Sequence, residues 1–204
     1  MTRLPGTGTA SPKRLAAVAL AGVAYFVIAV VVLALLNPDM SPLAIPISGY
    51  QEGRHPLLAA TTFFALATAV AALTLALRAT LKRGWFAGLG LTMFWIAAAG
   101  RVTAGVFPGM PMHAVGALMT FPWLSLGAVF LSLALGRIPQ WGALRFPLLT
   151  LALTICAMLL TWLNVLSARG LSGLGQRLYF AVLFGWMTVV ALRIMKHSPV
   201  ASRQ

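Results

Sequence analysis

Very few side chains of this chain could bind a charged ligand or take part in a reaction. The group that we single out is Glu52, Arg54, His55, Arg101, His113, Gln176 and Arg177, and the only acid besides Glu52 is Asp39. Guanidinium groups bind phosphate and carboxylate oxygens through paired hydrogen bonds. Because arginine outnumbers acid in this group, its composition indicates a site for an anionic group.

Six apolar runs separate and position these residues. They cover residues 15–36, 57–77, 85–106, 112–135, 144–166 and 174–195. Each meets the length of roughly 20 residues that a membrane-spanning helix needs. The charged fraction is 8%, whereas soluble domains have about 25%. We predict an all-α, polytopic membrane protein with one six-helix transmembrane domain over residues 15–195 and no soluble module.

The segments that flank this domain are polar. Residues 1–14 are predicted to form a mobile basic N-terminal tail, and residues 196–204 a C-terminal tail. The first apolar run is longer than the core of a signal peptide, which has about 7–15 residues, and no small-residue cleavage pattern follows it. We therefore expect a retained first helix.

The fifteen Lys and Arg residues are distributed unevenly between the two ends of the predicted bundle. One end carries eleven of them: Arg3, Lys13, Arg14, Arg78, Lys82, Arg83, Arg137, Arg145, Arg193, Lys196 and Arg203. The other end carries Arg54, Arg101, Arg169 and Arg177. Short loops with the Lys and Arg excess stay in the cytoplasm, so both termini are predicted to be cytoplasmic. We expect a multi-pass protein of the cell membrane, in a bacterium the inner (cytoplasmic) membrane, and no nucleic-acid partner.

The longest connection, residues 37–56, lies at the end with fewer basic residues. It contains four prolines, which argue against a regular helix, and we predict that it caps the bundle. Arg101 lies one or two helical turns below the same surface, and the turn at 107–109 brings His113 toward its level. Gln176 and Arg177 begin the last run at that level too. The candidate group is therefore expected to form one outer polar layer.

Two interpretations of this layer remain open. In the structural one, Glu52 or Asp39 neutralises Arg101 or Arg177 and so holds the loop on the helix ends. In the other, arginine remains in excess and binds a phosphate or carboxylate headgroup. A third possibility is that the arginines only extend to the membrane interface.

Metal and nucleophile chemistry have weaker support in the sequence. His113 has no further ligands at a suitable spacing, because His55 lies in a loop and His197 at the opposite end. No Gly-x-Ser-x-Gly turn surrounds any serine. We therefore expect no metal site, no cofactor and no catalytic residue. The absence of acids inside the runs also argues against proton or sodium coupling.

Three local segments resemble a known family. They are Pro46-Ile47-Ser48-Gly49-Tyr50-Gln51-Glu52-Gly53; Gly105-Val106-Phe107-Pro108 with His113, Gly116-Ala117 and Phe121; and Gly173-Leu174-Gly175-Gln176-Arg177-Leu178. Together with the helix number and loop order, they resemble the uncharacterised six-helix membrane proteins of the DUF998 family. The resemblance implies an integral membrane fold, brings no established activity, and points to His113 and Arg177.

The chain departs from that family at two places. Gly49 and Tyr50 stand where the family favours an acid and Leu, and Gly109 stands where an acid often follows Phe-Pro. If those acids serve a shared activity, this chain either lacks it or carries it at Glu52.

Three hypotheses for function follow. The first is an accessory, non-enzymatic bundle whose outer polar layer binds a lipid headgroup or small anion. The second is a small transporter or a transporter subunit, and the third is an intramembrane enzyme that uses His113 as a base. Membrane lipids, an anionic headgroup among them, are the expected partners, and a membrane-protein partner or a homo-oligomer stays open.

Overall fold

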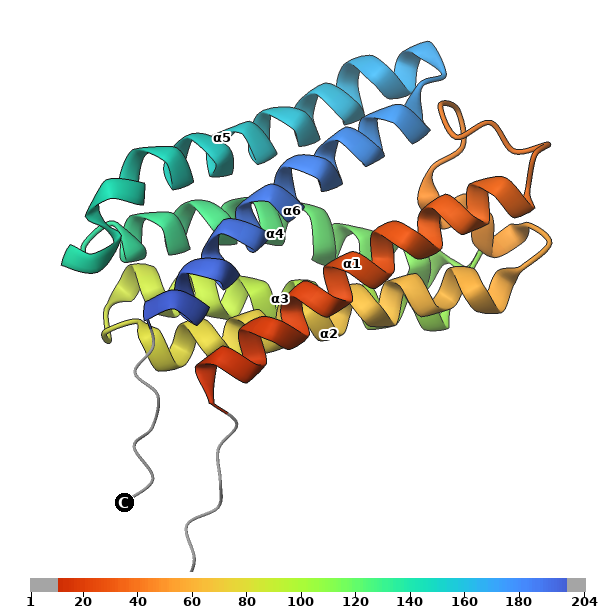
Figure 1. The fold of residues 1–204 in the computed structure, drawn as a ribbon. Helices are drawn as coiled ribbons and strands as arrows, with labels where there is room; N and C mark the ends of the chain where they lie inside the picture. Colours follow the sequence, from red (N-terminus) through yellow and green to blue (C-terminus); the bar gives the residue numbers. More distant parts are fainter. Residues whose placement is uncertain (1–10, 198–204) are drawn as a thin grey trace, which may run out of the picture.

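The computed structural model describes residues 11–197, which form a bundle of long helices (Figure 1). The long helices are α1 (Pro12–Leu36), α2 (Pro56–Thr80), α3 (Trp85–Val106), α4 (Pro111–Leu135), α5 (Arg145–Thr161) and α6 (Ser172–His197). Short elements are the 3-10 helices η1 (Ile47–Glu52), η2 (Pro139–Leu144) and η4 (Ser167–Arg169), and the π-helical turn η3 (Trp162–Leu166). Within residues 11–197, six segments are long and apolar enough to cross a membrane, which confirms the predicted six-helix all-α fold.

Helices α1, α2, α4 and α6 extend further than the apolar runs that predicted them, whereas α3 has the predicted bounds and α5 is shorter than its run. Ser11 caps α1 by accepting a hydrogen bond of 3.3 Å from the backbone N–H of Arg14, so Lys13 and Arg14 belong to the helix and not to a tail. Helix α6 likewise includes Lys196. The rest of the two expected tails, residues 1–10 and 198–204, lies outside the described residues.

Consecutive helices pack side by side, and α6 closes the bundle by packing against α1. The most extensive contact is between α3 and α4, where Gly100 and Gly116 face each other. A Cβ atom added to Gly116 would lie 2.6 Å from the carbonyl oxygen of Gly100. Small residues let membrane helices approach closely enough for dispersion to hold them together. This pair therefore fixes α3 and α4 as one unit.

The start of α1 and the end of α6 lie at the same end of the bundle, together with the α2–α3 and α4–α5 connections (Figure 1). Residues 37–55, 107–110 and 167–171 form the opposite end, which we call the outer end. The basic connections thus gather at one end and the candidate residues at the other, as the charge distribution predicted.

Candidate functional site

The connection between α1 and α2 is fastened onto the start of α6. The backbone N–H groups of Gly173 and Leu174 donate to the carbonyl oxygens of Ala44 and Leu43, at 3.2 and 2.9 Å. These N–H groups have no partner inside the helix, so the loop satisfies them. A Cβ atom on Gly173 would collide with the carbonyl oxygen of Ile45. The prediction that this loop caps the bundle is confirmed, although it also contains the short helix η1.

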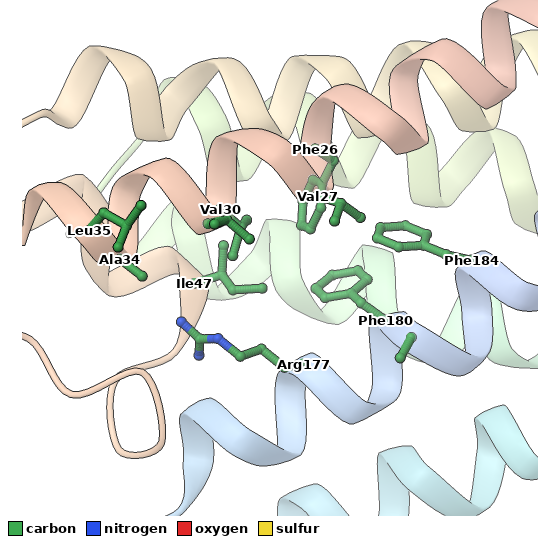
Figure 2. A pocket seen from close by; sticks show the side chains of 11 residues that line it. Phe26, Val27, Val30, Ala34, Leu35, Ile47, Arg177, Phe180 and Phe184 are labelled. Atoms are coloured by element: carbon green, nitrogen blue, oxygen red, sulfur yellow. The ribbon is translucent and has the colours of Figure 1, made fainter.

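Two of the candidate side chains serve this attachment. Arg177 donates to the carbonyl oxygens of Ile45 and Gly173, at 3.1 and 3.0 Å, and to the hydroxyl of Tyr50 at 3.1 Å. Gln176 accepts a hydrogen bond of 2.5 Å from the backbone N–H of Ile47. Figure 2 shows Arg177 reaching from α6 toward Ile47, at the end of an apolar groove of about 370 Å³ between α1 and α6. Both residues hold the loop in place.

The two acids do not neutralise the arginines of the helices. Asp39 forms an ion pair of 2.9 Å with Arg54, and both side chains are exposed. Glu52 is exposed and pairs with no cation of the described chain, while His55 is exposed just before α2. The expectation that Glu52 or Asp39 pairs with Arg101 or Arg177 is therefore wrong. The loop turns its carboxylates toward water, which avoids the cost of desolvating them.

Arg101 is buried without a counter-ion. Its side chain lies on α3, the residue is 3% exposed, and its Nε atom is buried with no hydrogen-bond partner. No hydrogen bond or ion pair joins its other nitrogens to any residue between 11 and 197. Its Cζ atom lies 4.2 Å from the ring centroid of Phe63, with Phe180 at 5.5 Å and Phe26 at 6.0 Å. Such cation–π contacts contribute about 2 kcal/mol when desolvated, which is less than the cost of burying an unpaired charge.

Arg101 lines a hollow of about 470 Å³ at the outer end, which we call the outer cavity. Its polar lining consists of Ser48, Arg101, His113 and Gln176, and the remainder is apolar. Leu118 of α4 and Leu163 of η3 also line it, and they are 68% and 55% exposed on the flank of the bundle. The outer cavity therefore opens sideways between α4 and α5, toward the space that lipid fills in a membrane.

Both helices beside this opening are irregular. Pro122 lies inside α4 and has no backbone N–H, so the carbonyl of Leu118 lacks its helical partner. On the other side, α5 passes into the π-helical turn Trp162–Leu166. Pro122 and Trp162 both line the outer cavity. Helix interruptions of this kind are frequent at functional sites, because they widen the space between helices and free polar backbone groups.

His113 faces the outer cavity with a defined tautomer. Its Nδ1 atom lies 2.9 Å from the carbonyl oxygen of Ala104. Since a carbonyl only accepts hydrogen bonds, Nδ1 carries the proton and Nε2 of the neutral ring is left as an acceptor. Ala104 follows Arg101 by three residues, or about 4.5 Å of helical rise. His113 thus lies closer to the outer surface than the backbone of Arg101 does.

A smaller hollow of about 350 Å³ adjoins the outer cavity on the side of the loop, and we call it the vestibule. Pro46, Ser48, His113 and Ala114 line both spaces. Glu52 lines only the vestibule, beside Gly109 in the α3–α4 turn. Gly49 and Gly109, where the chain departs from the family it resembles, line the vestibule too. The outer cavity and the vestibule thus share one wall, and the vestibule holds one carboxylate.

The structure divides the predicted polar layer into three parts. Asp39, Arg54 and His55 lie on the exposed rim; Gln176 and Arg177 attach the loop; and Arg101 and His113 line the outer cavity, with Glu52 at its vestibule. Within residues 11–197, no three His, Cys, Asp or Glu side chains gather as metal ligands would. Sequence reasoning missed Tyr50 and Trp162. Tyr50 accepts a hydrogen bond from Arg177, and Trp162 lines the outer cavity and donates to the hydroxyl of Ser172. Neither contact has a sequence signal.

The three segments that carried the family resemblance meet at this site. Gln51 of the first segment donates to the carbonyl oxygen of Gly105 in the second, at 3.3 Å, and Ile47 of the first binds Gln176 of the third. The model of a family described as a protein of unknown function, DUF998, matches residues 20–193. Comparison with curated proteins and with solved structures finds no match.

Proposed function

We propose that this chain, a member of the DUF998 family, binds an oxyanion group of a membrane-lipid headgroup in the outer cavity, with Arg101 as the counter-ion. The observation that carries this proposal is the guanidinium of Arg101, which lines an open cavity and has no carboxylate and no hydrogen bond from the described chain. A guanidinium remains protonated in proteins. An oxyanion that enters the outer cavity would supply the charge and the acceptors that Arg101 lacks.

The shape and lining of the outer cavity favour a lipid over a free anion. Most of its lining is apolar, and Leu118 and Leu163 lie at its lateral opening. A lipid places a charged group next to an apolar chain, so one molecule would satisfy Arg101 and cover these leucines. An inorganic anion would leave the apolar part unfilled.

The other two hypotheses have less support from the geometry. A transporter needs a polar path through the inner half of the bundle. The buried hydroxyls of Thr74, Ser125 and Ser132 instead donate to carbonyl oxygens of their own helices. An enzyme that uses His113 as a base would have a free Nε2 atom. In a catalytic triad, however, a carboxylate orients the ring, whereas among the described residues the backbone carbonyl of Ala104 binds it. Binding therefore remains the function that we put forward.

The proposal places the bound headgroup in the leaflet away from the cytoplasm. Its support is the excess of Lys and Arg at the end of the bundle that contains the starts of α1 and α3. With both termini in the cytoplasm, the outer end and its lateral opening lie on the opposite side of the membrane.

The proposal is tested by native mass spectrometry of the purified protein with added phospholipids. Arg101→Gln removes the charge with little change of volume. Loss of one charge-assisted contact, about 1.5–3 kcal/mol, would lower retention of anionic phospholipid roughly 10- to 100-fold. Arg54→Gln is the matched control, because it removes an arginine from the same end but outside the outer cavity. Equal retention by both variants and the unchanged protein would contradict the proposal.

A further inference from the structure

The two acids of the chain occupy different electrostatic situations. Asp39 is paired with Arg54 on the rim, whereas Glu52 lines the vestibule and has no cationic partner in the described chain. A chain with fifteen basic residues and two acids has ample charge to neutralise a second carboxylate. The position of Glu52 therefore leaves one negative group available to a ligand, in the space that adjoins the cavity of Arg101.

The groups that line the two adjoining spaces follow an order from the bundle to the outer surface. Leu118 and Phe121 form the apolar part, and Arg101 supplies the positive charge. His113 is bound one turn above Arg101, at the level of Ala104. Glu52 lies further out, where a Cβ atom on Gly109 would be 3.8 Å from its Oε1 atom. From the bundle outward, the lining thus changes from apolar side chains to a cation, then to a hydrogen-bond acceptor and finally to an anion.

We propose that the lipid carries a phosphate ester of an amino alcohol, with the phosphate at Arg101 and a primary ammonium group at Glu52. This inference rests on the proposed function and specifies its ligand. Along such a lipid the acyl chain, the phosphate and the ammonium group follow one another. The apolar lining, Arg101 and Glu52, which would bind these three parts, follow one another in the same order. The ammonium group has three donors, which Glu52, the Nε2 atom of His113 and the hydroxyl of Ser48 are placed to accept.

A quaternary ammonium group fits the vestibule less well. It has no N–H to donate, and proteins recognise it with the faces of several aromatic rings. The described residues that line the vestibule include no Phe, Tyr or Trp. The aromatic rings of this region, Phe26, Phe63 and Phe180, surround the guanidinium of Arg101 instead. The vestibule thus selects a hydrogen-bonding ammonium group.

The test compares three phospholipids with identical acyl chains, namely phosphatidylethanolamine, phosphatidylcholine and phosphatidylglycerol, for retention by the full chain. The unchanged protein is expected to retain the ethanolamine lipid about tenfold better than the choline lipid, the size of one charge-assisted hydrogen bond. In Glu52→Gln this preference disappears, and retention of the glycerol lipid rises or stays the same. Asp39→Asn is the matched control, because it removes the other acid and should keep the preference.

The results separate this inference from the function on which it rests. A preference for the ethanolamine lipid that survives Glu52→Gln, or no preference in the unchanged protein, overturns the inference. If Arg101→Gln still lowers retention of all three lipids in that case, the proposed headgroup site stands. If Arg101→Gln lowers none of them, both fail.

Discussion

The Nδ1 atom of His113 donates a hydrogen bond of 2.9 Å to the carbonyl oxygen of Ala104, and this bond ties the start of α4 to the end of α3. It brings an imidazole with a free acceptor beside a guanidinium that can only donate, since Arg101 lines the same cavity. Two groups of opposite hydrogen-bonding character thus face one space.

The first expectation concerns stability in the absence of lipid. Arg101→Met removes a buried charge that has no described counter-ion and fills a similar volume. An unpaired charge is costly to bury, and an apolar side chain of similar volume does not carry this desolvation cost. We expect delipidated Arg101→Met to unfold at a higher temperature than the unchanged protein in the same detergent, and added anionic lipid to stabilise only the unchanged protein. A lower melting temperature of Arg101→Met in both conditions would show that Arg101 is a structural residue.

The second expectation concerns the tautomer of His113. Nitrogen-15 NMR of the histidine-labelled protein should show His113, in its neutral form, protonated at Nδ1 and unprotonated at Nε2. The physical reason is that the Ala104 carbonyl can only accept. The exposed His55 serves as the internal control and should show the mixture of tautomers of a solvated ring. A proton on Nε2 of neutral His113 would remove the acceptor on which the ligand arrangement depends.

The third expectation compares two glycines of α6. Gly173→Ala places a Cβ atom against the carbonyl oxygens of Pro42 and Ile45, so the loop must move away from the helix. We expect a loss of about 1–3 kcal/mol in the free energy of unfolding and faster hydrogen exchange in residues 41–50. Gly185→Ala is the control, since nothing lies within 4 Å of its added Cβ. It should be neutral or stabilising by up to about 1 kcal/mol. Equal effects of the two substitutions would argue against the loop attachment.

The fourth expectation concerns orientation in the membrane. In a Cys156→Ser background, which removes the single cysteine, Gly84→Cys and Ser41→Cys introduce exposed thiols at opposite ends of the bundle without changing the charge distribution. A membrane-impermeant thiol reagent added to intact cells should label Ser41→Cys and leave Gly84→Cys unlabelled. The reverse labelling would place both termini outside, against the Lys and Arg distribution.

The number and the bounds of the spanning helices were largely predictable because hydropathy marks them. Runs such as 85–106 and 112–135 have the length and composition of spanning helices, and the structure gives α3 and α4 almost the same bounds. The capping loop was predictable from its prolines. The π-helical turn Trp162–Leu166 was not, because it depends on how Trp162 packs against Gly175 of another helix.

The sequence predicted which residues gather at the candidate site, but it did not predict which arginine pairs with which carboxylate. Sequence position places Arg54, Arg101 and Arg177 near one end of the bundle. Which of them meets a carboxylate depends on the direction in which the loop turns its side chains. The loop directs Asp39 to Arg54 on the rim and fixes Arg177 with carbonyl oxygens. Of these three arginines, Arg101 alone has no ion pair or hydrogen bond to the described residues. Arg177 therefore attaches the loop, whereas Arg101 is left for the proposed ligand.

The central claim is that an anionic group of a lipid neutralises Arg101 in the outer cavity. An experimental structure of the protein in a bilayer that contains its native phospholipids tests it most directly. We expect density for a headgroup oxygen within hydrogen-bond distance of the guanidinium of Arg101, with an acyl chain leaving between α4 and α5. An outer cavity that contains only water, or a Glu52 carboxylate bound to Arg101, would contradict the claim.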